Sequence, residues 1–242
     1  MQQSADRKTR ILRLLPYLGI FGSALISLAV LVGALVYSGE QGERYSLMNH
    51  FISELGRIGV SRAAWLFNAA MVASGILFIP FCAGISLRLK SVLGWLAFAA
   101  GFCASVACAG VGFFPMNNLP FHIAFATWFF RLGLLMVVFY GIAILAQPRG
   151  APRLPRAASL ISLPAVAAFT AFLSLAGMLT GGGANPLDIS SFSARRAPFW
   201  PLALLEWSIF FTTVLWFLAM GIVEVSSLRY PFSAPMVRPS IK

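Results

Sequence analysis

The residues best suited to chemistry lie in one stretch between two apolar segments, Tyr45-Ser-Leu-Met-Asn-His-Phe-Ile-Ser-Glu-Leu-Gly56. A histidine titrates near neutral pH, and a neighbouring carboxylate can orient it or take its proton. His50 and Glu54 are four residues apart, so they would share one face of a helix. The pair is a candidate acid–base or binding site, although a solvated pair on a helix surface has the same spacing.

A zinc site is the sharpest form of this hypothesis. A catalytic zinc ion needs three protein ligands, and His50 and Glu54 supply two. His122, Asp188 and Glu206 are the residues that could complete the set. The candidate metal ligands are therefore His50, Glu54, His122 and Asp188. The chain has no Cys-x-x-Cys or Cys/His zinc spacing, so zinc remains the alternative to no cofactor at all.

Arg131 is the most informative polar residue within an apolar segment. It lies about ten residues into its segment, about 15 Å deep along a helix. A charge at that depth costs at least a few kcal/mol and usually faces a partner or a cavity. One interpretation is a buried ion pair with Glu206 that fixes helix register. The other is the cationic floor of a pocket for a lipid headgroup or an anion.

Two more polar residues stand at the start of apolar segments. His122 begins one of them, where it forms local hydrogen bonds or belongs to an outer polar pocket. Asn68 begins another and is expected to hydrogen-bond a neighbouring helix. The complete set of candidate ligand-binding residues is Arg131, Asn68, His50, Glu54, His122 and Glu206.

The composition indicates which elements must position these residues. Of 242 residues, 59% are hydrophobic and 10% are charged, against about 25% charged in a soluble domain. A membrane span needs about 20 mostly apolar residues, and in lipid it must be helical. The sequence therefore predicts an all-α polytopic bundle, as one integral membrane domain, followed by a cytoplasmic tail at 226–242. The expected spans are Leu14–Tyr37, Ala64–Leu87, Val92–Phe114, Phe121–Ala146, Ala158–Thr180 and Leu202–Val225. The three cysteines lie in apolar runs and are expected to be buried small residues.

The basic residues predict the orientation of the bundle. Of the 18 lysines and arginines, 12 lie on the side of the termini and 5 on the other, with Arg131 inside a span. The positive-inside rule then predicts that both termini lie in the cytoplasm. The expected location is the inner (plasma) membrane of the cell. The net charge of +11 is an orientation signal, because there is no folded basic domain for a nucleic acid.

The first outer loop is predicted to contain an amphipathic helix. At about 100° per residue, the apolar residues from Leu47 to Ile58 gather on one side. The polar residues, His50 and Glu54 among them, gather on the other. Such a helix would lie in the outer interface with its apolar side against lipid or the bundle.

Several of these motifs occur together in a known family. Ile52-Ser-Glu-Leu-Gly56, Leu66-Phe-Asn68 and Gly75, with Gly112-Phe-Phe-Pro115 and a histidine heading the next span, resemble the domain of unknown function 998 family. That family comprises six-span membrane proteins of bacteria and archaea. In outline, the chain is also similar to six-span proteins of the damage-regulated autophagy modulator type. The resemblance implies six spans and a significant outer motif, and it implies no activity.

Three functional classes remain open. The first is a non-enzymatic protein that binds membrane lipids, or a membrane protein partner, at the outer leaflet. The second is an interfacial metal-dependent hydrolase that uses the outer His, Glu and Asp residues. The third is a small transporter, which typically shows inverted repeats and broken helices. The first is favoured because ionisable groups are sparse and Arg131 is deep.

Overall fold

The computed structural model describes residues 2–149, 153–181 and 197–229, and within these ranges every regular element is helical. Six long α-helices and three short 3₁₀ helices, marked η, follow one another along the chain. The elements are α1 (Gln2–Leu35), η1 (Ile52–Gly56), α2 (Ala64–Leu89), α3 (Val92–Phe113), η2 (Met116–Asn118), α4 (Leu119–Leu145), η3 (Arg156–Ile161), α5 (Ser162–Gly181) and α6 (Pro201–Arg229).

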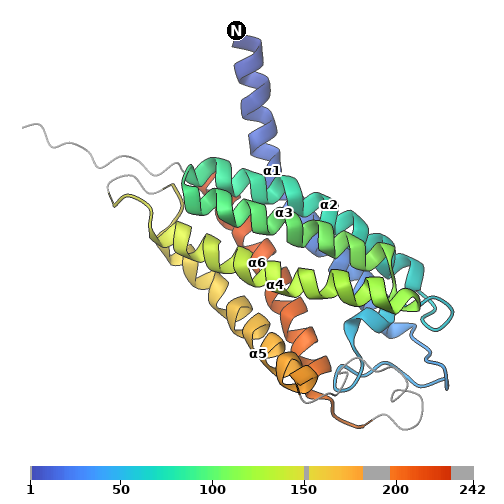
Figure 1. Ribbon diagram of the computed structural model, residues 1–242. Helices are drawn as coiled ribbons and strands as arrows, with labels where there is room; N and C mark the ends of the chain where they lie inside the picture. The colour runs from blue at the N-terminus through green and yellow to red at the C-terminus, as the bar shows by residue number, and fades with distance from the viewer. Residues whose placement is uncertain (1, 150–152, 182–196, 230–242) are drawn as a thin grey trace, which may run out of the picture.

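The six α-helices form one bundle in which each helix packs against the next and α6 packs back against α1. The start of α1 extends beyond the bundle, and the end of α6 lies on the same side (Figure 1). We call this side the terminal end. The opposite side, which carries η1, η2 and residues 197–200, is the loop end.

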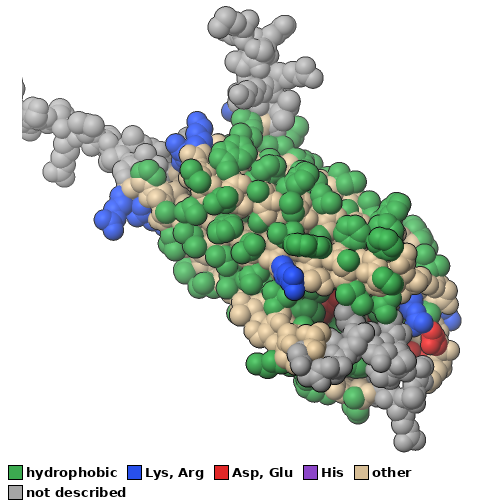
Figure 2. Space-filling model, viewed as in Figure 1, with side chains coloured by type: hydrophobic (Ala, Val, Ile, Leu, Met, Phe, Trp, Pro, Cys, Tyr) green, Lys and Arg blue, Asp and Glu red, His purple; other side chains and the backbone are tan. Residues whose placement is uncertain are grey.

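All six predicted spans are confirmed as helices long and apolar enough to cross a membrane. The apolar part of the first runs over Leu12–Leu35, and the last runs over Pro201–Leu228. Apolar side chains cover the sides of the bundle, and basic side chains gather at the terminal end (Figure 2). The protein is therefore a multi-pass membrane protein. Contrary to expectation, Cys103 is exposed on the surface, whereas Cys82 and Cys108 are buried.

Local chemistry explains the sharp turn between α2 and α3. Lys90 adopts a left-handed conformation with φ 48°, and its N–H bonds to Ser86 O as α2 ends. Ser91 then caps α3, because its hydroxyl oxygen accepts from Gly94 N at 3.1 Å. A serine in this position satisfies one of the unpaired N–H groups of a new helix.

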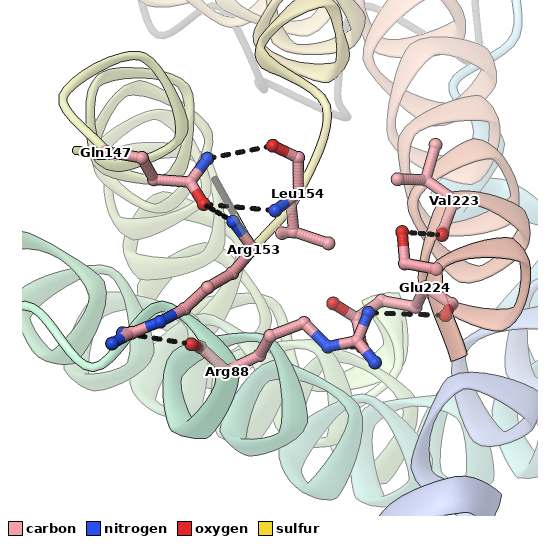
Figure 3. Close-up of polar contacts among 7 residues, drawn as sticks. Arg88, Gln147, Arg153, Leu154, Val223 and Glu224 are labelled. Carbon is pink, nitrogen blue, oxygen red and sulfur yellow. Dashed lines mark hydrogen bonds and ion pairs between the residues drawn. The ribbon is translucent and has the colours of Figure 1, made fainter. Parts of the chain in front are cut away.

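A cluster of polar side chains lies at the terminal end (Figure 3). The side-chain amide of Gln147 donates to Leu154 O at 3.1 Å, and its oxygen accepts from the backbone N–H groups of Arg153 and Leu154. Arg88 forms an ion pair with Glu224 at 3.6 Å. These contacts join the connection after α4 to α2 and α6, because Arg153 also donates to Leu89 O.

Helices α2 and α3 approach closely because two glycines face the neighbouring backbone. A Cβ atom on Gly75 would lie 2.6 Å from Ser105 O. A Cβ atom on Gly112 would lie 2.5 Å from Asn68 O. Small residues permit such contacts in membranes, where no hydrophobic force drives helices together.

Replacing Gly112 by alanine is expected to destabilise the bundle. Because the new methyl group would meet the α2 backbone, we expect a loss of about 1–3 kcal/mol, typical of overpacking. Reversible unfolding in detergent measures the change. Gly177→Ala on α5 is the matched control, since nothing lies within 4 Å of its added Cβ. Equal stability of the two variants would contradict the close approach.

Candidate functional site

The segment Phe51–Gly56 enters the loop end of the bundle and is buried throughout. A short helix is present there, as predicted, but it is the five-residue 3₁₀ helix η1. Phe51 is 1% exposed and Leu55 is 0% exposed. η1 contacts α1, α2, α6 and η2. The helix is shorter than the expected stretch Leu47–Ile58, and its own residues are buried, whereas Leu47, Met48 and Ile58 beside it are exposed.

Two carboxyl groups satisfy the first N–H groups of this buried segment. Glu54 Oε1 accepts from Phe51 N at 2.8 Å, and Glu206 Oε2 accepts from Ile52 N at 2.7 Å. Glu54 belongs to η1 itself, whereas Glu206 stands on α6. The N–H groups at the start of a helix have no partner within the helix. The carboxyl groups supply these partners, and a charge there also suits the helix dipole.

Asn68 on α2 satisfies the other end of η1. Its side-chain Nδ2 donates to Gly56 O at 2.8 Å. A Cβ atom on Gly56 would lie 2.2 Å from Asn68 Oδ1, so only glycine fits here without movement. The expected hydrogen bond from Asn68 thus exists, and its partner is the backbone of the loop segment. The two motifs Ile52–Gly56 and Leu66–Asn68 form one structural unit.

Aromatic side chains hold the segment that leads into η1. Tyr45 OH donates to Phe51 O at 2.8 Å, and Trp207 Nε1 on α6 donates to His50 O at 3.2 Å. His50 is 2% exposed and packs against the rings of Tyr37 and Tyr45. Because no α-helix covers His50, the predicted shared helical face of His50 and Glu54 is absent.

A central cavity of about 80 Å³ lies directly below η1. Its roof is formed by Ile52 and Ser53, and its walls come from α1, α2, α3, α4 and α6. Most of the lining is apolar or aromatic. The wall residues include Phe67, Met71, Phe78, Ala126, Phe130, Phe210 and Phe217. Figure 2 shows a recess in the side of the bundle toward the loop end, with acidic side-chain atoms at its base.

Five polar side chains border this cavity, and they are Ser53, Ser74, His122, Glu206 and Thr213. Ser74 is already engaged, because its hydroxyl donates to Gly22 O at 2.9 Å. His122 is 4% exposed, and its Nδ1 lies 2.9 Å from Phe114 O. Thr213 Oγ1 is buried with no hydrogen-bond partner among the described residues. Thr213 lies seven residues beyond Glu206, so the two share one face of α6, about 10 Å apart along the axis.

The structure therefore brings together only part of the predicted site. His122 and Glu206 both line the cavity. Glu54 and Asn68 support its roof, and His50 stands apart among aromatic rings. Sequence reasoning did not select Ser53 and Thr213. The spacing of seven between Glu206 and Thr213 was a detectable signal.

Arg131 occupies a different place from the one expected. It is exposed on the surface of α4 and does not line the cavity. Between described residues, ion pairs join Arg57 to Glu40 and Arg88 to Glu224, and none involves Arg131. The interpretations as a buried partner of Glu206 and as the floor of a pocket are therefore not supported. A long arginine side chain can instead extend along the bundle toward polar surroundings.

The predicted metal ligands do not form a cluster within the described part of the chain. There, no three His, Cys, Asp or Glu side chains lie close enough to hold a metal ion. His50 and Glu54 serve the loop structure, and His122 lies at the cavity. Asp188, the fourth candidate, lies outside the described residues.

Glu206→Ala is expected to destabilise the protein, because it leaves the buried Ile52 N–H without an acceptor. The expected cost is about 1–3 kcal/mol in the free energy of unfolding. Glu206→Gln keeps an oxygen at this place and should cost less. Hydrogen exchange at the Ile52 amide gives a local measurement. Glu40→Ala, which removes only a surface pair with Arg57, is the control and should change stability by about 0–1 kcal/mol. Equal exchange in the Ala and Gln variants would contradict this role.

We expect the buried Tyr45 to make the protein less stable to unfolding at alkaline pH. Burial first, and then the charges of Glu206 and Glu54, raise the pKa of Tyr45 well above its usual value. The folded protein thus favours the neutral phenol, whereas the unfolded chain ionises near pH 10. This contribution is complete below about pH 10 and is lost as the pH rises further. Unfolding measured from pH 8 to 11 should show a smaller decline for Tyr45→Phe than for the wild type. Tyr17→Phe, at an exposed residue of α1, should decline as the wild type does.

Comparison with known proteins agrees with this architecture. A family model described as protein of unknown function (DUF998) matches residues 20–223. The match begins within the first span and ends within the sixth, and it includes both halves of the η1 site. Among curated proteins and among solved structures, none matches the chain significantly. The chain belongs to the DUF998 family, as the motifs around Gly56 and Asn68 indicated.

Proposed function

We propose that this protein binds a membrane lipid or a small amphiphile whose small headgroup and first chain carbons occupy the central cavity. The observation that carries the proposal is an apolar space below η1 with polar groups at its roof. Ligand sites typically combine an apolar lining with a few polar groups that fix orientation. The polar groups here lie at the loop end, and the apolar walls extend toward the middle of the bundle.

The size of the cavity limits what it holds. Its volume of about 80 Å³ is roughly half of the ~150 Å³ that accommodates benzene in an engineered protein cavity. The cavity therefore suits a small headgroup with the first carbons of a chain. The rest of such a chain would lie against the apolar sides of the bundle. A whole phospholipid headgroup is too large.

The proposed orientation places this cavity in the outer half of a plasma membrane. The excess of lysine and arginine at the terminal end supports cytoplasmic termini. A bacterial inner membrane is the setting proposed from the family resemblance. Ligand would then reach the cavity from the outer leaflet. The exposed Arg131 would contact lipid or a second membrane protein.

Binding has more support than catalysis in this geometry. The carboxyl groups of Glu54 and Glu206 are engaged by the N–H groups of η1. The candidates for a metal-dependent hydrolase do not gather as ligands within the described residues. A transporter would need broken helices, and α1 to α6 are each continuous over their described lengths.

Filling the cavity should remove ligand. Ala126 on α4 lines the cavity, and Ala126→Leu adds a side chain that occupies its space. Native mass spectrometry of protein released from nanodiscs should show retained lipid or amphiphile on the wild type and less on this variant. Ala124→Leu is the matched control, because Ala124 is exposed on the same helix. Equal retention by all three proteins would overturn the proposal.

A further inference from the structure

The polar side chains that line the central cavity near η1 present acceptor atoms. The geometry points to a ligand whose headgroup donates hydrogen bonds: an uncharged alcohol or an amine at the end of an apolar chain. This inference rests on the proposed function and deepens it, because it names the chemical class of the ligand.

The hydrogen bond of His122 fixes which ring nitrogen carries the proton. Its Nδ1 lies 2.9 Å from Phe114 O. A carbonyl oxygen only accepts, so Nδ1 carries the hydrogen, and in the neutral ring Nε2 is an acceptor. Among the described residues, Nε2 has no hydrogen-bond partner. His122 lines the cavity, where this lone pair is available to a ligand.

Ser53 and Glu206 contribute further acceptors. The Ser53 hydroxyl has one hydrogen, for which Met116 Sδ at 3.5 Å and the Glu206 carboxyl group compete, and the lone pairs of its oxygen remain. Glu206 accepts from Ile52 N and also hydrogen-bonds to Ser53, and a carboxylate has lone-pair sites for about four donors. The three side chains come from η1, α4 and α6, so they converge on the cavity from different elements.

The arrangement discriminates between headgroups. A hydroxyl or amine group would donate to these atoms and satisfy buried polar groups on both sides. A carboxylate or phosphate headgroup carries only lone pairs toward these three acceptors. The Thr213 hydroxyl can donate to one of its oxygens, and the other buried oxygens would remain unsatisfied. Leaving such groups without partners is costly, so anionic amphiphiles should bind less well.

Four probes with a chain of the same length test the inference: decan-1-ol, decylamine, decanoate and decane. Each is added to purified protein in phosphatidylcholine nanodiscs, and the apparent affinity is obtained from the rise in Tm with ligand concentration. Decan-1-ol and decylamine should stabilise the protein, and decanoate and decane should do so less.

Two substitutions of His122 identify the acceptor. His122→Asn places an amide where Nδ1 was, so it keeps the bond to Phe114 O and removes Nε2 from the cavity. It should weaken decan-1-ol binding about two- to tenfold, the value of one neutral hydrogen bond, and leave decane binding unchanged. His122→Gln reaches the position of Nε2 with its oxygen and should retain more of the affinity for decan-1-ol. Should His122→Gln fail to fold, the wild type and His122→Asn still decide the question.

The outcomes separate this inference from the proposed function. Equal binding of decane and decan-1-ol would leave a chain-binding cavity but overturn recognition of a donor headgroup. Preference for decanoate, or unchanged decan-1-ol affinity in His122→Asn, would also overturn it. No stabilisation by any of the four probes, together with no effect of Ala126→Leu on lipid retention, would overturn the proposed function itself.

Discussion

Backbone that is not α-helical and lies buried among membrane-crossing helices must find hydrogen-bond partners within the protein. η1 is such a segment, and the most specific contacts of the loop end serve it. Glu54 and Glu206 accept from its first N–H groups, and Asn68 donates to its last carbonyl. Gly56 is required because Asn68 stands so close. These contacts bind three distant parts of the chain into one unit and set the roof of the central cavity.

The cavity follows from the same arrangement. η1 spans only five residues, so it covers the loop end of the bundle without filling the space beneath. Aromatic side chains from α2, α4 and α6 line that space. Their bulk and limited rotamers do not close it fully. Glu206, which satisfies the Ile52 N–H of η1, is therefore also one of the polar groups that line the cavity.

The six helices could be predicted from sequence because length and hydropathy nearly determine a membrane span. Most boundaries agree within a few residues, since charged and turn residues mark them. The loop segment was harder. Its apolar residues follow the period of an α-helix, but periodicity cannot tell whether the polar side faces water or buried partners. The N–H groups at the start of η1 donate to Glu54 and to the distant Glu206. A local sequence pattern does not reveal the partner that lies far away in the chain.

For the candidate site, the sequence predicted some of the residues but not that they lie together. His122 and Glu206 were selected separately, as polar residues near the ends of apolar segments. Their meeting depends on how six helices close into one bundle. Ser53 and Thr213 were not selected, because serine and threonine are common in membrane helices and loops. Arg131 was assigned to the interior on the cost of burying a charge in lipid. That cost falls when a flexible side chain extends along the surface, and Arg131 is exposed.

The bond between Ile52 and Glu206 also constrains the order in which the protein assembles. The two residues are 154 positions apart, and α6 leaves the ribosome after α1 to α5. Until it inserts, the Ile52 N–H has no carboxyl partner, and water must take its place. Glu54 and Asn68 are already present by then, so η1 lacks one of its three polar partners until α6 is in place. A chain interrupted before α6 would leave the loop end incomplete.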